Sequence, residues 1–187
     1  MEKNNLFQKE KRIEFLIVLV FVLVGAGLRL LPHLPNFVPI TAIALFSGAF
    51  LSKRVALVLP LIAMIISDKF IGFYDIKLMA AVYGSFLLCV VIGFWIRKNK
   101  KWYRILGGSI SATLIFFVLT NFAFWVFTGF YARTISGLVQ CYLAALPFLR
   151  NSFLGDLTYV IIFFGAFAIA NVLVKKALKI KVVQSIS

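Results

Sequence analysis

The chain has 187 residues, 63% of them hydrophobic, and a mean hydropathy of +1.02. This composition excludes an ordinary soluble domain and indicates an integral membrane protein. A formal net charge of +14 would suggest a nucleic-acid partner in a soluble chain, but the basic residues here adjoin apolar segments, so we expect contact with membrane lipid headgroups and no nucleic acid.

The first apolar segment follows a polar start and has no small-residue cleavage site soon after it. We therefore expect a retained first helix rather than a cleaved signal peptide. A helix needs about 20 residues to cross the hydrocarbon core, and about 17 can suffice. By this criterion residues 1–187 form one transmembrane domain with six predicted spans, at Ile13–Leu31, Asn36–Leu51, Val55–Tyr74, Leu78–Ile96, Ile105–Thr128 and Phe153–Val174.

The second and third spans are short, because their strictly apolar runs cover only Ile40–Leu51 and Val55–Ser67, with Pro60 inside the latter. A re-entrant hairpin is the alternative. It would leave Lys53 and Arg54 near the bilayer centre, at a cost of several kcal/mol each. Two short crossings are therefore predicted, and the third must continue through Asp68 and Lys69.

The region Gly129–Arg150 is predicted to be an amphipathic helix in the outer loop rather than a seventh span. Arg133, Ser136 and Gln140 lie opposite a helical apolar face, and Pro147 is expected to end the helix. Such a helix can lie at the membrane interface. The apolar face consists of Ile135, Leu138, Val139, Tyr142, Leu143 and Leu146.

Four basic clusters alternate with pairs of predicted spans. Short cytoplasmic loops are enriched in Lys and Arg, so both termini are expected to be cytoplasmic, in a membrane that the chain crosses several times. The clusters are Lys3, Lys9, Lys11 and Arg12; Lys53 and Arg54; Arg97, Lys98, Lys100, Lys101 and Arg104; and Lys175, Lys176, Lys179 and Lys181.

Three ionisable residues outside these clusters, Arg29, Asp68 and Asp156, lie within or beside predicted spans. Ionisable groups at such positions are costly unless they are paired or face a cavity, so they are candidate functional residues. The alternative is that Arg29 reaches the headgroups and that Asp68 simply pairs with a neighbouring cation. The excess of outer Arg over acid favours an anionic or zwitterionic ligand, although headgroup contact also accounts for it.

A polar stripe at the outer end of the fifth span is a second candidate. Asn121, Trp125 and Thr128 are spaced i, i+4, i+7 and share one helical face. Tyr131, Arg133 and Thr134 follow directly. Polar groups on an apolar wall are typical of a small-molecule site, whereas a lone Trp would be read as an interfacial anchor.

Metal and catalytic chemistry are poorly supported by the sequence. The outer candidates Asp68, Asp75, Asp156, His33 and Cys141 are spread along the chain, so we expect no metal site and no cofactor. His33 has no nucleophile or carboxylate nearby in sequence, so we expect no enzyme, with an intramembrane enzyme as the weakest alternative. Cys89 and Cys141 are predicted at different depths, without a disulfide.

Several separated blocks between Arg29 and Gly165 carry a further signal: Asn36–Ala49, Pro60-Leu61, Ser67-Asp68, Tyr131–Thr134, Gly137-Leu138, Cys141-Tyr142 and Pro147-Phe148. These blocks resemble an uncharacterised bacterial family of integral membrane proteins described as transport proteins. That family in turn resembles the S-components of energy-coupling factor (ECF) transporters, six-helix proteins that capture vitamins or metal ions at the outer face.

The resemblance implies a substrate-binding transport component with an S-component-like bundle and a vitamin-like organic ligand. An ECF-type ATPase module is an implied partner. Ile13–Leu31 lacks the Ala-x-x-x-Ala docking pattern of S-components, so docking would use other small residues such as Ala44 and Gly48, or the protein works alone. A non-transporting assembly or anchoring protein is the alternative function. The candidate substrate-binding residues are Arg29, Asn36, Asp68, Asn121, Trp125, Thr128, Tyr131, Arg133, Thr134, Gln140, Tyr142 and Asp156.

Overall fold

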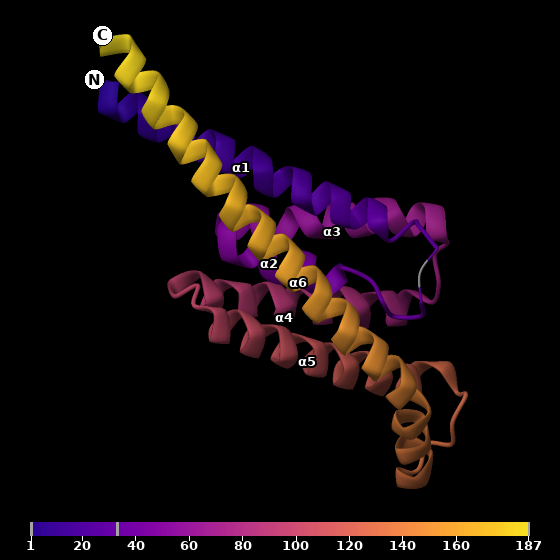
Figure 1. The fold of residues 1–187 in the computed structure, drawn as a ribbon. Coiled ribbons are helices and arrows are strands. Elements are labelled where there is room, and N and C mark those ends of the chain that lie inside the picture. The colour runs from indigo at the N-terminus through magenta and orange to yellow at the C-terminus, as the bar shows by residue number, and fades with distance from the viewer. Residues whose placement is uncertain (1, 33, 187) are drawn as a thin grey trace.

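The computed structural model describes residues 2–32 and 34–186, and the side chains of residues 2–7, 10 and 179–186 are outside this description. His33 and the side chains of Lys3, Lys179 and Lys181 therefore lie outside the described residues. The described part is all-helical (Figure 1). Its six helices are α1 Glu2–Leu28, α2 Ile40–Phe50, α3 Lys53–Ile71, α4 Ile76–Lys98, α5 Trp102–Thr128 and α6 Ile135–Ile186.

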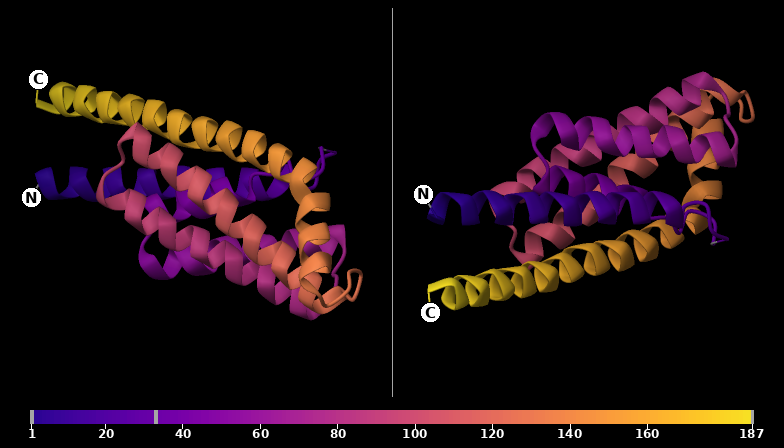
Figure 2. Two further views of the ribbon diagram at one scale, coloured as in Figure 1. Left: turned by 90° about the horizontal axis from the view of Figure 1, so that it is seen from below. Right: turned by 90° about the horizontal axis from the view of Figure 1, so that it is seen from above.

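The helix connections alternate between two ends of the bundle (Figures 1 and 2). Both termini lie at one end with the α2–α3 and α4–α5 links, and the other three links lie at the opposite end. The first end, here called the basic end, holds Lys53–Arg54 and Arg97–Arg104 at its links. The opposite end is called the distal end. By length and composition α4, α5 and Ile135–Leu178 of α6 are each able to cross a membrane, which supports a membrane protein.

Helix α2 forms the centre of the bundle. It has 11 residues, and all of them except Phe50 are buried. The reason is that each of the other five helices contacts α2. Phe46 is fully buried and makes ring contacts with Phe21, Phe163, Phe164 and Phe167. At about 1.5 Å per residue, this helix is about half as long as the hydrocarbon core is thick. It is therefore shorter than the span Asn36–Leu51 predicted from sequence.

The backbones of α2 and α4 meet at two glycines. A Cβ atom on Gly48 would overlap the carbonyl oxygen of Val90 and lie 2.7 Å from Cα of Gly93, and a Cβ on Gly93 would lie 2.5 Å from the Leu45 carbonyl oxygen. Small residues permit such close helix packing in membranes. Ala44 is also fully buried, so Ala44 and Gly48 pack inside the bundle and offer no surface to a coupling module.

The Arg97 side chain binds the C-terminal end of α2. Its Nε donates a 3.0 Å hydrogen bond to the Gly48 carbonyl oxygen, and a guanidinium NH₂ donates to the carbonyl oxygens of Gly48 and Leu51. The last carbonyls of a helix have no partner within it, and a cation there also complements the helix dipole. Arg97 therefore satisfies the buried end of α2, a role that the basic clustering did not predict.

The prediction that Pro147 ends the outer helix is wrong, because α6 runs without interruption from Ile135 to Ile186 with Pro147 inside it. A proline removes one backbone hydrogen bond and kinks a helix, and the neighbouring turns can continue. Figures 1 and 2 show a marked bend in the orange part of α6. The predicted outer helix is thus the first limb of α6.

The first limb of α6 meets the bundle through small residues. Gly137, Cys141 and Ala145 are buried, whereas Ile135, Val139, Leu143 and Leu146 of the predicted apolar face are exposed. Exposed apolar residues on a helix beside a membrane suit contact with lipid, which agrees with an interfacial position. The buried side is set by the close approach to the loop, because a Cβ on Gly137 would overlap the Ala132 carbonyl.

The Gly48–Gly93 contact gives a stability prediction. Gly48→Ala should lower the free energy of unfolding by about 1–3 kcal/mol, since the added methyl meets backbone atoms that move only if the helices separate. Thermal unfolding of the purified protein in detergent measures this change. Gly84→Ala is the matched control, because a Cβ on Gly84 of α4 meets nothing within 4 Å. Equal unfolding temperatures for the two variants would contradict the packing argument.

Candidate functional site

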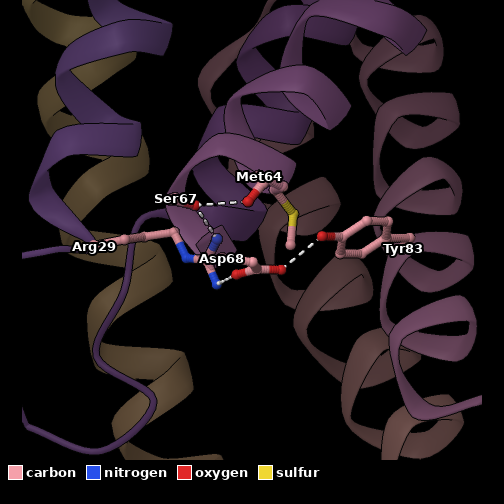
Figure 3. Close-up of polar contacts among 5 residues, drawn as sticks. All are labelled: Arg29, Met64, Ser67, Asp68 and Tyr83. Atoms are coloured by element: carbon pink, nitrogen blue, oxygen red, sulfur yellow. Dashed lines mark hydrogen bonds and ion pairs between the residues drawn. The ribbon is translucent and has the colours of Figure 1, made fainter. Parts of the chain in front are cut away.

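The distal end of the bundle contains a buried ion pair (Figure 3). Arg29 lies just after α1, and its Nη2 atom is 2.8 Å from Oδ1 of Asp68 on α3. Its Nη1 atom donates a hydrogen bond to the Ser67 hydroxyl. Tyr83 on α4 donates a 2.6 Å hydrogen bond to Oδ2 of Asp68, and Ser67 donates to the Met64 carbonyl oxygen. The Asp68 carboxylate thus joins the end of α1 to α3 and α4.

Asp68 is buried, Arg29 is mostly buried, and each is the charged partner of the other. The side chain of Asp68 is 2% exposed and that of Arg29 is 12% exposed. Buried charges require a partner and hydrogen bonds, and here both are present. Arg29 is therefore the cation that pairs with Asp68, and the positive charge of Arg29 is balanced within the protein.

A cavity of about 220 Å³, here called the inner cavity, lies beside this pair. Its lining comes from the residues after α1, the beginning of α2, the α3–α4 loop, α4, the middle of α5 and the part of α6 around Asp156. Most of these elements meet at the distal end. The lining residues are Arg29, Asn36, Val38, Ile40, Thr41, Tyr74, Val82, Thr113, Phe116, Phe117, Thr120, Asn121, Ser152 and Asp156.

Asp156 on α6 is the second buried carboxylate, and it lines the inner cavity. It is 3% exposed. The Thr113 hydroxyl on α5 lies 2.6 Å from Oδ2 of Asp156, and Thr41 on α2 is a second hydrogen-bonding side chain. Among the described residues no basic side chain forms an ion pair with Asp156. Asp156 is therefore hydrogen-bonded to neutral hydroxyls alone.

Tyr74 brings an uncharged aromatic group to the cavity wall from the α3–α4 loop. Partial burial raises the pKa of Tyr74 above its usual value, the Asp68 carboxylate raises it further, and Arg29 acts in the opposite direction. Tyr74 is therefore a neutral phenol at physiological pH, and it adds a ring and a hydroxyl to the cavity without changing the charge.

A second cavity of about 410 Å³, the outer cavity, adjoins the first limb of α6. Asn36 and Asn121 line both cavities, so these two side chains lie where the cavities adjoin. Asn36 has a φ of 60°, a left-handed conformation that Asn tolerates better than most residues. The other lining residues are mainly apolar: Phe124, Phe130, Tyr131, Cys141, Ala144, Ala145 and Phe148.

The remaining predicted site residues hold the α5–α6 loop or lie on the surface. Trp125 Nε1 donates a 2.9 Å hydrogen bond to the Ala132 carbonyl oxygen, and the Arg133 guanidinium carbon lies 5.9 Å from the centre of the Trp125 ring. Thr128 and Thr134 accept hydrogen bonds from backbone N–H groups of the loop and of α6. Of the stripe Asn121–Trp125–Thr128, Asn121 alone lines these two cavities.

Two more predicted site residues belong to the first limb of α6. Tyr142 donates a 2.7 Å hydrogen bond from its hydroxyl to the Val118 carbonyl oxygen on α5, and it does not line either cavity. Gln140 is exposed. The structure therefore brings Arg29, Asn36, Asn121 and Asp156 together at the inner cavity, with Asp68 directly behind Arg29, and Tyr131 at the outer cavity.

Sequence reasoning missed the hydroxyl residues of the inner cavity, namely Thr41, Thr113, Thr120 and Ser152. Their spacing was a usable signal: Thr113 and Thr120 are seven residues apart on α5, and Ser152 and Asp156 are four apart on α6, so each pair shares a helical face. It also missed Tyr83 as a partner of Asp68.

The residues offer little for a metal ion. No group of three or more His, Cys, Asp or Glu side chains with suitable geometry occurs among the described residues. Cys89 and Cys141 are both buried and unpaired thiols. The inner cavity instead offers one unpaired carboxylate, hydroxyls, amides and aromatic rings, a set that suits a small organic molecule.

The all-helical fold and the three helices able to cross a membrane place the chain among α-helical membrane proteins. Residues 9–178 match the family of unknown function DUF6580, and the chain belongs to that family. This result confirms that the chain belongs to an uncharacterised family. Neither the curated proteins nor the solved structures contain a match to this chain.

The ion pair gives a second stability prediction. Asp68→Asn should lower the free energy of unfolding by about 3–5 kcal/mol, because Arg29 would remain buried without its counter-charge. Tyr83→Phe, which removes one hydrogen bond to the same carboxylate, should cost about 1 kcal/mol. The double variant Arg29→Met, Asp68→Leu should recover much of the loss. Unfolding in mixed micelles would measure all three, and a double variant as unstable as Asp68→Asn would contradict the explanation.

Proposed function

We propose that this protein binds a small organic solute in the inner cavity and serves its uptake across the bacterial cytoplasmic membrane. The observation that carries the proposal is a cavity at the distal end whose lining includes Asp156, amides, hydroxyls and aromatic rings. Small-molecule sites combine a concave apolar wall with a few convergent polar groups. A vitamin-like organic solute suits this wall better than a metal ion.

The proposed orientation follows from the distribution of charge. Lys and Arg are enriched in cytoplasmic loops, so the basic end and both termini are assigned to the cytoplasm and the distal end to the outside. In this arrangement all six helices cross or enter the membrane, and the inner cavity is reached from the outer face. The other five helices contact the short α2, so both of its ends can lie within the protein rather than at the membrane surfaces.

The proposed role is that of a substrate-binding component, in the manner of the S-components that the sequence resembles. Transport requires an energy source, and an ATPase coupling module is the proposed partner, with membrane lipid around the bundle. Because Ala44 and Gly48 are internal, such a module would contact another surface of the bundle. The exposed apolar face of α1, which includes Leu16, Val20 and Leu23, is available to lipid or to a partner helix.

The orientation predicts opposite accessibility of two loops. In cells carrying Asn99→Cys or Phe130→Cys, a membrane-impermeant thiol reagent added outside should label position 130 and leave position 99 unlabelled until the membrane is opened. Asn99 follows α4 at the basic end, and Phe130 is highly exposed in the α5–α6 loop. The native Cys89 and Cys141 are buried and give a low background. Labelling of both positions from one side would refute the topology.

The binding role predicts a ligand that co-purifies with the protein. Native mass spectrometry of the gently purified chain should detect a bound small molecule, and Asn121→Leu should abolish it by removing the amide shared by both cavities. Gln140→Leu is the matched control, because Gln140 is exposed and lies outside both linings. A ligand retained equally by both variants would contradict the proposed site.

A further inference from the structure

We propose that the ligand of the inner cavity carries a protonated amine, and that this ammonium group binds at Asp156. The inference rests on the proposed binding function and adds the chemical class of the ligand. It is argued from the charge inside the cavity, from the hydrogen-bonding groups of its wall and from its aromatic lining.

The charge balance of the cavity leaves one carboxyl group without a charged partner among the described residues. Arg29 and Asp68 form an ion pair at 2.8 Å and neutralise each other. Asp156 is 3% exposed, lines the cavity and forms no ion pair with a described basic side chain. An ionised carboxylate buried without a counter-charge is costly, and an ammonium group would remove that cost. Of the anionic or zwitterionic ligand that the excess of outer arginine favoured, the amine-bearing, zwitterionic kind remains compatible with this proposal, and a purely anionic ligand does not.

The hydrogen-bonding groups of the wall point to the same conclusion. Thr120 donates its hydroxyl hydrogen to the Phe116 carbonyl oxygen, and Ser152 donates to that of Phe148. Asn121 donates from its amide nitrogen to the Phe117 carbonyl oxygen. A hydroxyl has one hydrogen, so Thr120 and Ser152 retain acceptor capacity alone, and Asn121 retains its amide oxygen together with one N–H.

The acceptor oxygens of Thr120, Ser152 and Asn121 therefore favour a ligand that supplies donors at this part of the wall. An alkylammonium group has up to three N–H donors and no acceptor. It therefore matches a cavity wall that combines the Asp156 carboxyl group with hydroxyl and amide oxygens. The cavity of about 220 Å³ also includes the rings of Tyr74, Phe116 and Phe117. Aromatic faces attract cations, so these rings favour an ammonium group over a carboxylate. The volume equals that of about seven water molecules, so the charged part of the ligand is compact.

The test compares three probes of nearly equal size on the purified full-length protein in lipid nanodiscs at neutral pH. Butylammonium should raise the unfolding temperature by about 2–4 °C when the site is filled, while 1-butanol and butyrate at the same concentration should not. The variant Asp156→Asn should lose the response. Asp75→Asn is the matched control, because Asp75 is an exposed cap of α4, where Asn caps equally well.

A second variant covers the case in which Asp156→Asn does not fold. Thr120→Val preserves shape and removes one acceptor oxygen of the wall, so it should weaken butylammonium binding about tenfold. Unchanged affinity in Thr120→Val, or an equal response in Asp156→Asn and the parent protein, would overturn the proposal. So would stabilisation by butyrate or 1-butanol in place of the amine. Stabilisation by lowering the pH with no effect of amine would assign Asp156 to a proton alone and would also overturn it.

Failure of this inference and failure of the binding function give different results. A co-purifying molecule that is neutral or anionic and is lost in Asn121→Leu would keep the proposed function and overturn the amine. An amine among the co-purifying molecules, lost in Asp156→Asn and retained in Asp75→Asn, would support both.

Discussion

The complete burial of α2 is the constraint on which the rest of the structure depends. A helix of 11 residues surrounded by protein has no lipid or water to satisfy its ends. At the basic end Arg97 donates to its last carbonyls. At the distal end Thr41 contacts Asp156 and lines the cavity. The cavity is thus the space left where α2 begins, because the helix is too short to fill the bundle to its distal end.

Two buried carboxylates at the distal end differ in what balances them. Asp68 has a cation and the Tyr83 hydroxyl, and it joins three segments, so its role is structural. Asp156 is hydrogen-bonded to hydroxyls, has no cation beside it among the described residues and lines the inner cavity. An ionisable group in a membrane helix bundle without a charged partner is a candidate functional residue. Asp156 is therefore the stronger candidate for contact with a ligand, because Arg29 is already paired.

The apolar segments of the sequence predicted the helices well, because a long hydrophobic run has few alternatives to a helix in a membrane protein. Arg29, Asp68 and Asp156 were found for the same reason, as ionisable groups in apolar surroundings. The pairing of Arg29 with Asp68 across 39 residues depended on helix packing and could not be read from the chain. The effect of Pro147 was mispredicted, since a proline kinks a helix that its neighbours hold in place.

The continuous helix α6 contributes residues to the linings of both cavities. Cys141 and Phe148 on its first limb line the outer cavity, and Ser152 and Asp156, directly after the bend region, line the inner one. Pro147 lies between the two sets and removes one backbone hydrogen bond there, which makes this the least restrained turn between them. One helix therefore joins the two linings, with its residues up to Phe148 at the outer cavity and its residues from Ser152 onward at the inner one.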